Sequence, residues 1–187
     1  MSFPGIPSLD AAVMAFIQTH FHNTVTDTVF PIITSLGEAG IGWIVLSLVL
    51  LCFKKTRRTG GLVLIAMTVT LLFGELTLKN IICRLRPCNV FTNFPMLIAR
   101  PTSYSFPSGH TSSSFAAALI LTLRHKKVGW LAYIPAVLIA FSRIFLFVHY
   151  PTDVLAGILL GTLAALLTYF AAKAIQKRQA EKHTVQI

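Results

Sequence analysis

The stretch GGLVLIAMTVTLLFGELTLKNII, residues 60–82, decides the fold of this chain. Its 23 mostly apolar residues would extend about 34 Å as an α-helix, enough to cross a bilayer with some tilt. Further apolar runs cover residues 110–123, 128–148 and 153–172, and a shorter one covers 39–53. The sequence therefore predicts an all-α, polytopic membrane helix bundle with about five transmembrane helices.

The composition of the whole chain points the same way. Hydrophobic residues make up 55% of the sequence, charged residues only 12%, and the mean hydropathy is +0.73. So few charged residues cannot cover the water-facing surface of a soluble protein of 187 residues. These values exclude an ordinary soluble domain and favour a membrane protein.

The first part of the chain differs from the rest. Residues 9–21 and 24–36 mix apolar with polar side chains, which is typical of amphipathic helices that lie at the membrane interface. A sixth spanning segment or a re-entrant one stays open here. We expect one domain over residues 1–187: interfacial N-terminal helices in 1–37, a transmembrane catalytic core in 38–175 and a cytoplasmic tail in 176–187.

The net charge of +10 has a topological explanation that needs no nucleic-acid partner. Residues 1–53 contain no Lys or Arg, and three basic clusters lie between or after the apolar runs: Lys54, Lys55, Arg57 and Arg58; Arg124, Lys126 and Lys127; Lys173, Lys177, Arg178 and Lys182. The positive-inside rule places these clusters and the C-terminus in the cytoplasm. We expect a multi-pass protein of the cell (cytoplasmic) membrane. With five spans and the C-terminus inside, residues 83–109 and 149–152 lie on the extracytoplasmic face.

The first motif is Lys79-x6-Arg86-Pro87, at the end of the long apolar run. Two residues seven apart return to nearly the same face of a helix, so Lys79 and Arg86 could both reach a phosphate between them. Pro87 disfavours helix at Arg86 and predicts that the span ends there. Glu75, four residues before Lys79, is predicted to pair with it and support the site.

The second motif is Pro107-Ser108-Gly109-His110, directly before an apolar run. Ser108 is a candidate N-cap, and Gly109 allows the backbone to approach a ligand closely. The exposed N–H groups and the dipole of a helix N-terminus bind anions. His110 would lie beside such an anion, where it could protonate a leaving oxygen.

The third motif is Ser142-Arg143-x5-His149-x3-Asp153. Ser142 and His149 share a helix face, whereas Arg143 would point about 120° away, so we expect the helix to distort or end before His149. Asp153 can accept a hydrogen bond from one nitrogen of His149 and leave the other free to attack. Taken alone, a helix-capping Asp beside an interfacial His would give the same pattern.

In this order and with these spacings, the three motifs resemble the type 2 phosphatidic acid phosphatase superfamily, in its integral-membrane branch. The resemblance extends from about residue 36 to the last span. It implies three catalytic residues: His149 as nucleophile, Asp153 as the carboxylate that orients His149, and His110 as general acid. It also implies five phosphate-binding residues: Lys79, Arg86, Ser108, Gly109 and Arg143. Glu75, from its spacing to Lys79, and Ser142, from its place beside Arg143, are expected to support the site. A phosphohistidine intermediate follows, with no metal and no cofactor.

The predicted function is a metal-independent lipid phosphatase that removes a terminal phosphate at the extracytoplasmic face. Undecaprenyl diphosphate is the favoured substrate, followed by phosphatidylglycerol phosphate and phosphatidic acid. A lipid phosphotransferase with the same phosphohistidine, or a non-enzymatic lipid-phosphate binder or translocator, stays an alternative. The bilayer and the lipid phosphate are the expected partners, and no obligate protein partner is inferred.

Overall fold

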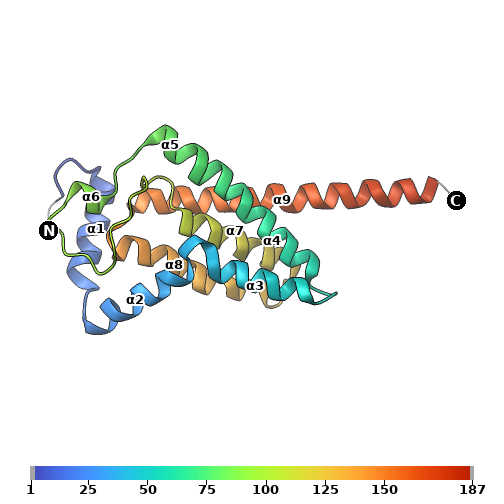
Figure 1. Cartoon of the computed structure of the whole chain (residues 1–187), viewed down its shortest axis with the longest axis horizontal. Helices are drawn as coiled ribbons and strands as arrows, with labels where there is room; N and C mark the ends of the chain where they lie inside the picture. Colours follow the sequence, from blue (N-terminus) through green and yellow to red (C-terminus); the bar gives the residue numbers. More distant parts are fainter. Residues whose placement is uncertain (1–2, 186–187) are drawn as a thin grey trace.

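A computed structural model describes residues 3–185, and side chains through residue 182. Within these residues all regular elements are helices, which confirms the predicted all-α class (Figure 1). The longer helices are α1 (Ser8–His20), α2 (Thr24–Leu36), α3 (Ile41–Cys52), α4 (Arg57–Thr70), α7 (Gly109–Arg124), α8 (Tyr133–Phe145) and α9 (Pro151–Val185). Shorter elements are α5 (Lys79–Ile82), α6 (Pro87–Val90), the π-helical η2 (Leu71–Leu78) and the 3₁₀ turns η1 (Glu38–Gly40) and η3 (Gly129–Ala132).

Helix α7 lies at the centre of the bundle, in contact with α4, α8 and α9. Two glycines of α9 permit the close approach of α7: a Cβ at Gly157 would lie 2.7 Å from the carbonyl oxygen of Ser108, and one at Gly161 would overlap the carbonyl oxygen of Ser112. This contact fixes the distance between the start of α7 and the start of α9. It therefore sets the relative positions of His110 and Asp153.

Replacement of Gly161 by alanine is expected to destabilise the protein by about 1–3 kcal/mol, because the added methyl group must push α7 and α9 apart. The melting temperature in detergent would measure the effect. Gly61→Ala is the matched control, since a Cβ there meets nothing within 4 Å and alanine is the better helix former. Equal melting temperatures for the two variants would contradict the packing argument.

The outer surface of the bundle is apolar. Along α9, five large hydrophobic residues recur on one exposed face: Leu155, Leu159, Leu163, Leu167 and Phe170. Within residues 3–185, two helical stretches are long and apolar enough to cross a bilayer, Arg57–Val90 and Pro151–Lys182. The bent pair Thr24–Leu36 and Glu38–Cys52, with 44° between its parts, would make a third. Such a surface belongs to a membrane protein.

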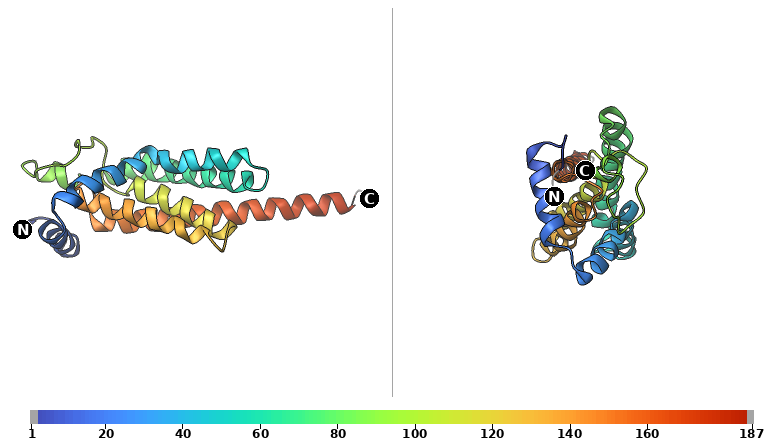
Figure 2. Two further views of the ribbon diagram at one scale, coloured as in Figure 1. Left: turned by 90° about the horizontal axis from the view of Figure 1, so that it is seen from below. Right: turned by 90° about the vertical axis from the view of Figure 1, so that its left-hand side faces the viewer.

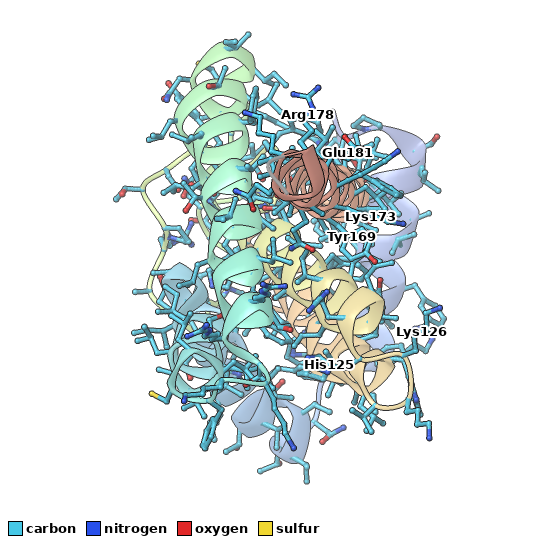
Figure 3. The ribbon with its side chains drawn as sticks, turned by 90° about the vertical axis from the view of Figure 1, so that its right-hand side faces the viewer. His125, Lys126, Tyr169, Lys173, Arg178 and Glu181 are labelled. Atoms are coloured by element: carbon cyan, nitrogen blue, oxygen red, sulfur yellow. The ribbon has the colours of Figure 1, made fainter. Side chains whose placement is uncertain are left out.

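The basic clusters lie together at one end of the bundle. The turn between α3 and α4, the turn after α7 and the C-terminal part of α9 are all at the end opposite to α1 (Figures 1 and 2). Viewed from that end, Lys173 and Arg178 lie around the projecting α9, and Lys126 lies apart from it in the turn after α7 (Figure 3). Helix α9 continues without a break past residue 176, the predicted start of the tail.

Candidate active site

The three motifs meet at the end of the bundle that carries α1. Lys79 begins α5 after the π-helical segment, and α5 ends at Ile82 because Cys83 adopts a left-handed conformation with φ of 50°. Arg86 therefore lies in extended chain, with φ −71° and ψ 151°. The helix ends four residues earlier than Pro87 alone predicted, so Lys79 and Arg86 do not share a helix face.

The segment that carries His149 begins where α8 ends, at Phe145. The helix thus ends before His149, as the position of Arg143 predicted. Phe147 turns the chain with φ of 60°, and its ring is stacked on Phe94 at a centroid distance of 3.9 Å. The backbone N–H of His149 then donates to the carbonyl of Arg143 at 3.2 Å. These contacts fix the buried imidazole relative to α8.

The hydrogen bonds of His149 define its tautomer. Arg86 Nη1 lies 2.9 Å from His149 Nε2, and because a guanidinium can only donate, Nε2 must be the unprotonated nitrogen. The proton then resides on Nδ1, which lies 3.5 Å from Asp153 Oδ2 and 3.5 Å from Ser105 Oγ. A neutral imidazole with a lone pair on Nε2 is the form that a nucleophile requires.

Asp153 is held by several donors at once. Its Oδ2 accepts from the Tyr150 N–H at 2.9 Å and from Ser105 Oγ, and its Oδ1 accepts from Arg84 Nη1 at 2.6 Å. The carboxylate is fully buried. It therefore has one orientation, with an oxygen on the side of His149.

Three cations surround the imidazole and leave donors for a ligand. Lys79 Nζ donates to Glu75 Oε2 at 2.7 Å, which is the predicted pair. Arg143 Nη1 donates to Thr34 Oγ1 at 2.5 Å, while its buried Nε has no hydrogen-bond partner among the described residues. Such an unpaired buried donor is costly unless a ligand accepts from it.

The electrostatics follow from this arrangement. Burial first, and then the charges of Arg86, Arg143 and Lys79, lower the pKa of His149 well below its ordinary value of 6.5. The imidazole is therefore neutral around pH 7 before a phosphate binds. Three converging cations and a neutral imidazole suit a phosphoryl group.

The second motif lies against this cluster. Ser108 is the N-cap of α7 and accepts from Thr111, and its own N–H donates to the carbonyl of Asp153 at 3.1 Å. A Cβ at Gly109 would overlap the carboxylate of Glu75, so only glycine leaves room for the Glu75–Lys79 pair. His110 Nε2 lies 3.4 Å from Glu38 Oε2 and makes no hydrogen bond of normal geometry among the described residues.

Sequence reasoning missed several residues of this site. Arg84 and Ser105 bind Asp153, Ser103 accepts from Arg86, Thr34 accepts from Arg143, and Glu38 faces His110. They lie in loops or in the N-terminal part, outside the three motifs. The remaining predicted residue, Ser142, donates within its own helix to the carbonyl of Ile139 at 2.6 Å.

Several known proteins are similar to this chain in sequence. A family model described as the PAP2 superfamily matches residues 59–177. A protein of Sulfolobus acidocaldarius named undecaprenyl-diphosphatase is 39% identical over 127 residues, which cover 67% of this chain and 61% of that relative. A protein of Bacillus licheniformis named bacitracin transport permease protein BcrC is 34% identical over 76% of this chain and 71% of its own length.

Solved structures give the same result for the fold. The crystal structure of a transmembrane PAP2-type phosphatidylglycerolphosphate phosphatase from Bacillus subtilis superposes with a TM-score of 0.73 at 29% identity, over 92% of this chain and 89% of that one. The structure of LpxE from Aquifex aeolicus superposes with a TM-score of 0.75 at 24% identity. The second match covers 90% of this chain and 99% of that one.

Proposed function

Because the chain belongs to the PAP2 superfamily, we propose that it is a lipid phosphatase that works through a phosphohistidine on His149. The observation that supports this most is the hydrogen bonding of His149, with Nε2 unprotonated at Arg86 and Nδ1 facing Asp153. This tautomer places the Nε2 lone pair on the side of the cations, where a nucleophile that attacks a bound phosphate needs it. The matched relatives named as diphosphatases and phosphatases support the same reaction class.

In the first half of the reaction, the Nε2 lone pair attacks phosphorus and the bond from phosphorus to the leaving oxygen breaks. Lys79, Arg86 and Arg143 hold the non-bridging oxygens. The negative charge of the bound phosphate offsets these cations and allows His110 to bind a proton, which it gives to the leaving group. Arg86 must first exchange its bond to Nε2 for one to a phosphoryl oxygen. Asp153 stabilises the positive charge that develops on the imidazole.

In the second half, water attacks phosphorus and the bond from Nε2 to phosphorus breaks. His110, left neutral by the first half, accepts the proton from that water and is ready for another cycle. Inorganic phosphate departs, and His149 returns to its neutral state. Apart from that water, the steps use only side chains of this site.

For the substrate we propose an isoprenyl diphosphate such as undecaprenyl diphosphate, with phosphatidylglycerol phosphate next. The first matched relative is named undecaprenyl-diphosphatase, and another, from Bacillus subtilis, is named phosphatidylglycerophosphatase B. The test is phosphate release by purified, chelator-treated protein from these two lipids and from phosphatidic acid. Preference for the diphosphate supports the proposal; no release from any of them, or transfer to an added acceptor lipid only, contradicts it.

For the topology we propose five crossings with the site outside and the C-terminus inside. The first crossing is made by α2 and α3 together, followed by α4 with η2 and α5, then α7, η3 with α8, and α9, while α1 lies at the interface. In this arrangement the first crossing begins at Thr24, whereas the sequence predicted interfacial helices up to residue 37 and a core from residue 38. The part of α9 after residue 175 extends into the cytoplasm. The location of the basic clusters at the end away from the site supports this orientation.

Single-cysteine variants test the orientation. Cys83 is exposed at the site end and Cys52 is exposed at the basic end. A membrane-impermeant thiol reagent added to intact cells is expected to label the Cys83 variant, and to label the Cys52 variant only after the membrane is opened. The reverse order would show that the site faces the cytoplasm.

A further inference from the structure

Helix α1 lies across the segment that joins α8 to α9, at the site end of the molecule (Figures 1 and 2). It lies outside residues 59–177, to which the family model applies. Four residues of α1 are buried: the apolar Met14 and Ile17, and the polar Asp10 and Gln18. An interfacial helix that only rests on the membrane would not bury a carboxylate completely, so the contacts of Asp10 require an explanation.

Asp10 binds the start of α9. Its Oδ1 accepts from the N–H of Thr152 at 2.9 Å, and its Oδ2 accepts from the Thr152 hydroxyl at 2.7 Å. Since Pro151 is the first residue of α9, the Thr152 N–H has no carbonyl partner within its own helix. Asp10 thus caps α9 from a distant part of the chain, with its negative charge at the positive end of the helix dipole.

Asp10 also binds the arginine that pairs with the candidate orienting carboxylate. Arg84 Nη2 donates to Asp10 at 2.7 Å, and Arg84 Nη1 donates to Asp153 at 2.6 Å. The guanidinium lies over the ring of Tyr150, 3.8 Å from its centroid. One cation is therefore shared by two fully buried carboxylates, so Asp153 keeps part of its negative charge for the Nδ1–H of His149.

At its other end, α1 binds the end of α8. Gln18 Nε2 donates at 3.0 Å to the carbonyl oxygen of Phe145. Phe145 is the last residue of α8, so its carbonyl oxygen has no N–H partner within the helix. Met14 and Ile17 lie between these two polar contacts, in the apolar cluster that also contains Leu146 and Val148. Helix α1 therefore holds both ends of the segment that presents His149.

We propose that Asp10 is a positioning residue for phosphoryl transfer: it holds Arg84 between two carboxylates and so sets the charge and orientation of Asp153 behind His149. This rests on the proposed function of His149. Without the Asp10 charge, Arg84 pairs fully with Asp153, and Asp153 then stabilises an imidazolium less well. Helix α1 thus acts on the reaction indirectly, through the position and charge of Asp153.

The test is Asp10→Asn in the full chain, because the amide keeps the size and one oxygen acceptor but removes the charge. The expected result is a fall in kcat on the order of 10- to 100-fold, by analogy with the hydrogen-bond partners that orient metal-binding histidines, whose loss costs that much. KM should stay within about twofold, since the phosphate-binding cations are untouched. Asp27→Asn is the matched control: Asp27 lies on α2, pairs with His22 at 2.7 Å, and should leave kcat unchanged.

A double variant separates this role from general destabilisation. Arg84→Gln alone leaves two buried carboxylates without a cation, whereas Asp10→Asn with Arg84→Gln restores the net charge of the group. We expect the double variant to turn over faster than the product of the two single effects predicts. Multiplicative effects, or a fall in kcat that follows the melting temperature in all variants, would overturn the inference.

The outcomes also separate this inference from the proposed function. Wild-type turnover that His149→Ala does not reduce overturns both. Wild-type turnover that His149→Ala abolishes and Asp10→Asn leaves unchanged overturns only the role of Asp10. Loss of kcat in Asp10→Asn with the wild-type KM and melting temperature supports it.

Discussion

His149→Ala is expected to lower phosphate release by about four orders of magnitude or more, the loss found when a nucleophile of a catalytic triad is removed. The substitution removes the Nε2 lone pair and leaves Asp153 and Arg86 facing an empty space. Water would then have to attack the lipid phosphate directly. Steady-state phosphate release in detergent measures the effect, with the melting temperature recorded alongside.

His125→Ala is the matched control for this substitution. His125 lies at the far end of the bundle, where its Nε2 is 3.0 Å from Thr59 Oγ1 (Figure 3). It should keep the wild-type rate. Comparable rates for His149→Ala and His125→Ala would show that the phosphoryl group does not pass through His149.

His110→Ala is expected to give the second largest loss, about 10²- to 10⁴-fold, because general acid catalysis typically contributes that much. The size should depend on the leaving group. Phosphatidic acid releases an alkoxide, which needs a proton, whereas an isoprenyl diphosphate releases a phosphate monoester, which departs readily without one. We therefore expect a larger loss with phosphatidic acid than with the diphosphate.

Rates of wild type and His110→Ala on both lipids check this prediction. The ratio of the two losses reports on proton transfer and is insensitive to a uniform loss of folded protein. Equal losses on both substrates would assign His110 to phosphate binding and not to leaving-group protonation.

Much of this arrangement could be predicted from local sequence. Long apolar runs predict helices, since their period and length are sufficient. The Ser108 N-cap and the Glu75–Lys79 pair depend on spacings within one helix, and both are present. The end of α8 before His149 followed from the direction in which Arg143 would otherwise point.

The features that could not be predicted depend on tertiary contacts. Cys83 ends α5 in a left-handed conformation that its residue type does not signal, and this moves Arg86 off the helix. Asp10 and Thr34 lie in N-terminal helices without a motif, and they join the site only because α1 and α2 pack on α8 and α9. Such residues have no local sequence signature, so only their partners in space identify them.

The measurement that tests the account most directly is detection of the phosphorylated enzyme. Protein mixed with a ³²P-labelled isoprenyl diphosphate and quenched in alkali should carry label that survives base and is lost in acid, as expected of a phosphorus–nitrogen bond. Peptide mapping should place the label on His149, and the His149→Ala protein should carry none. Product formation with no label on His149, or with label on another residue, would contradict the account.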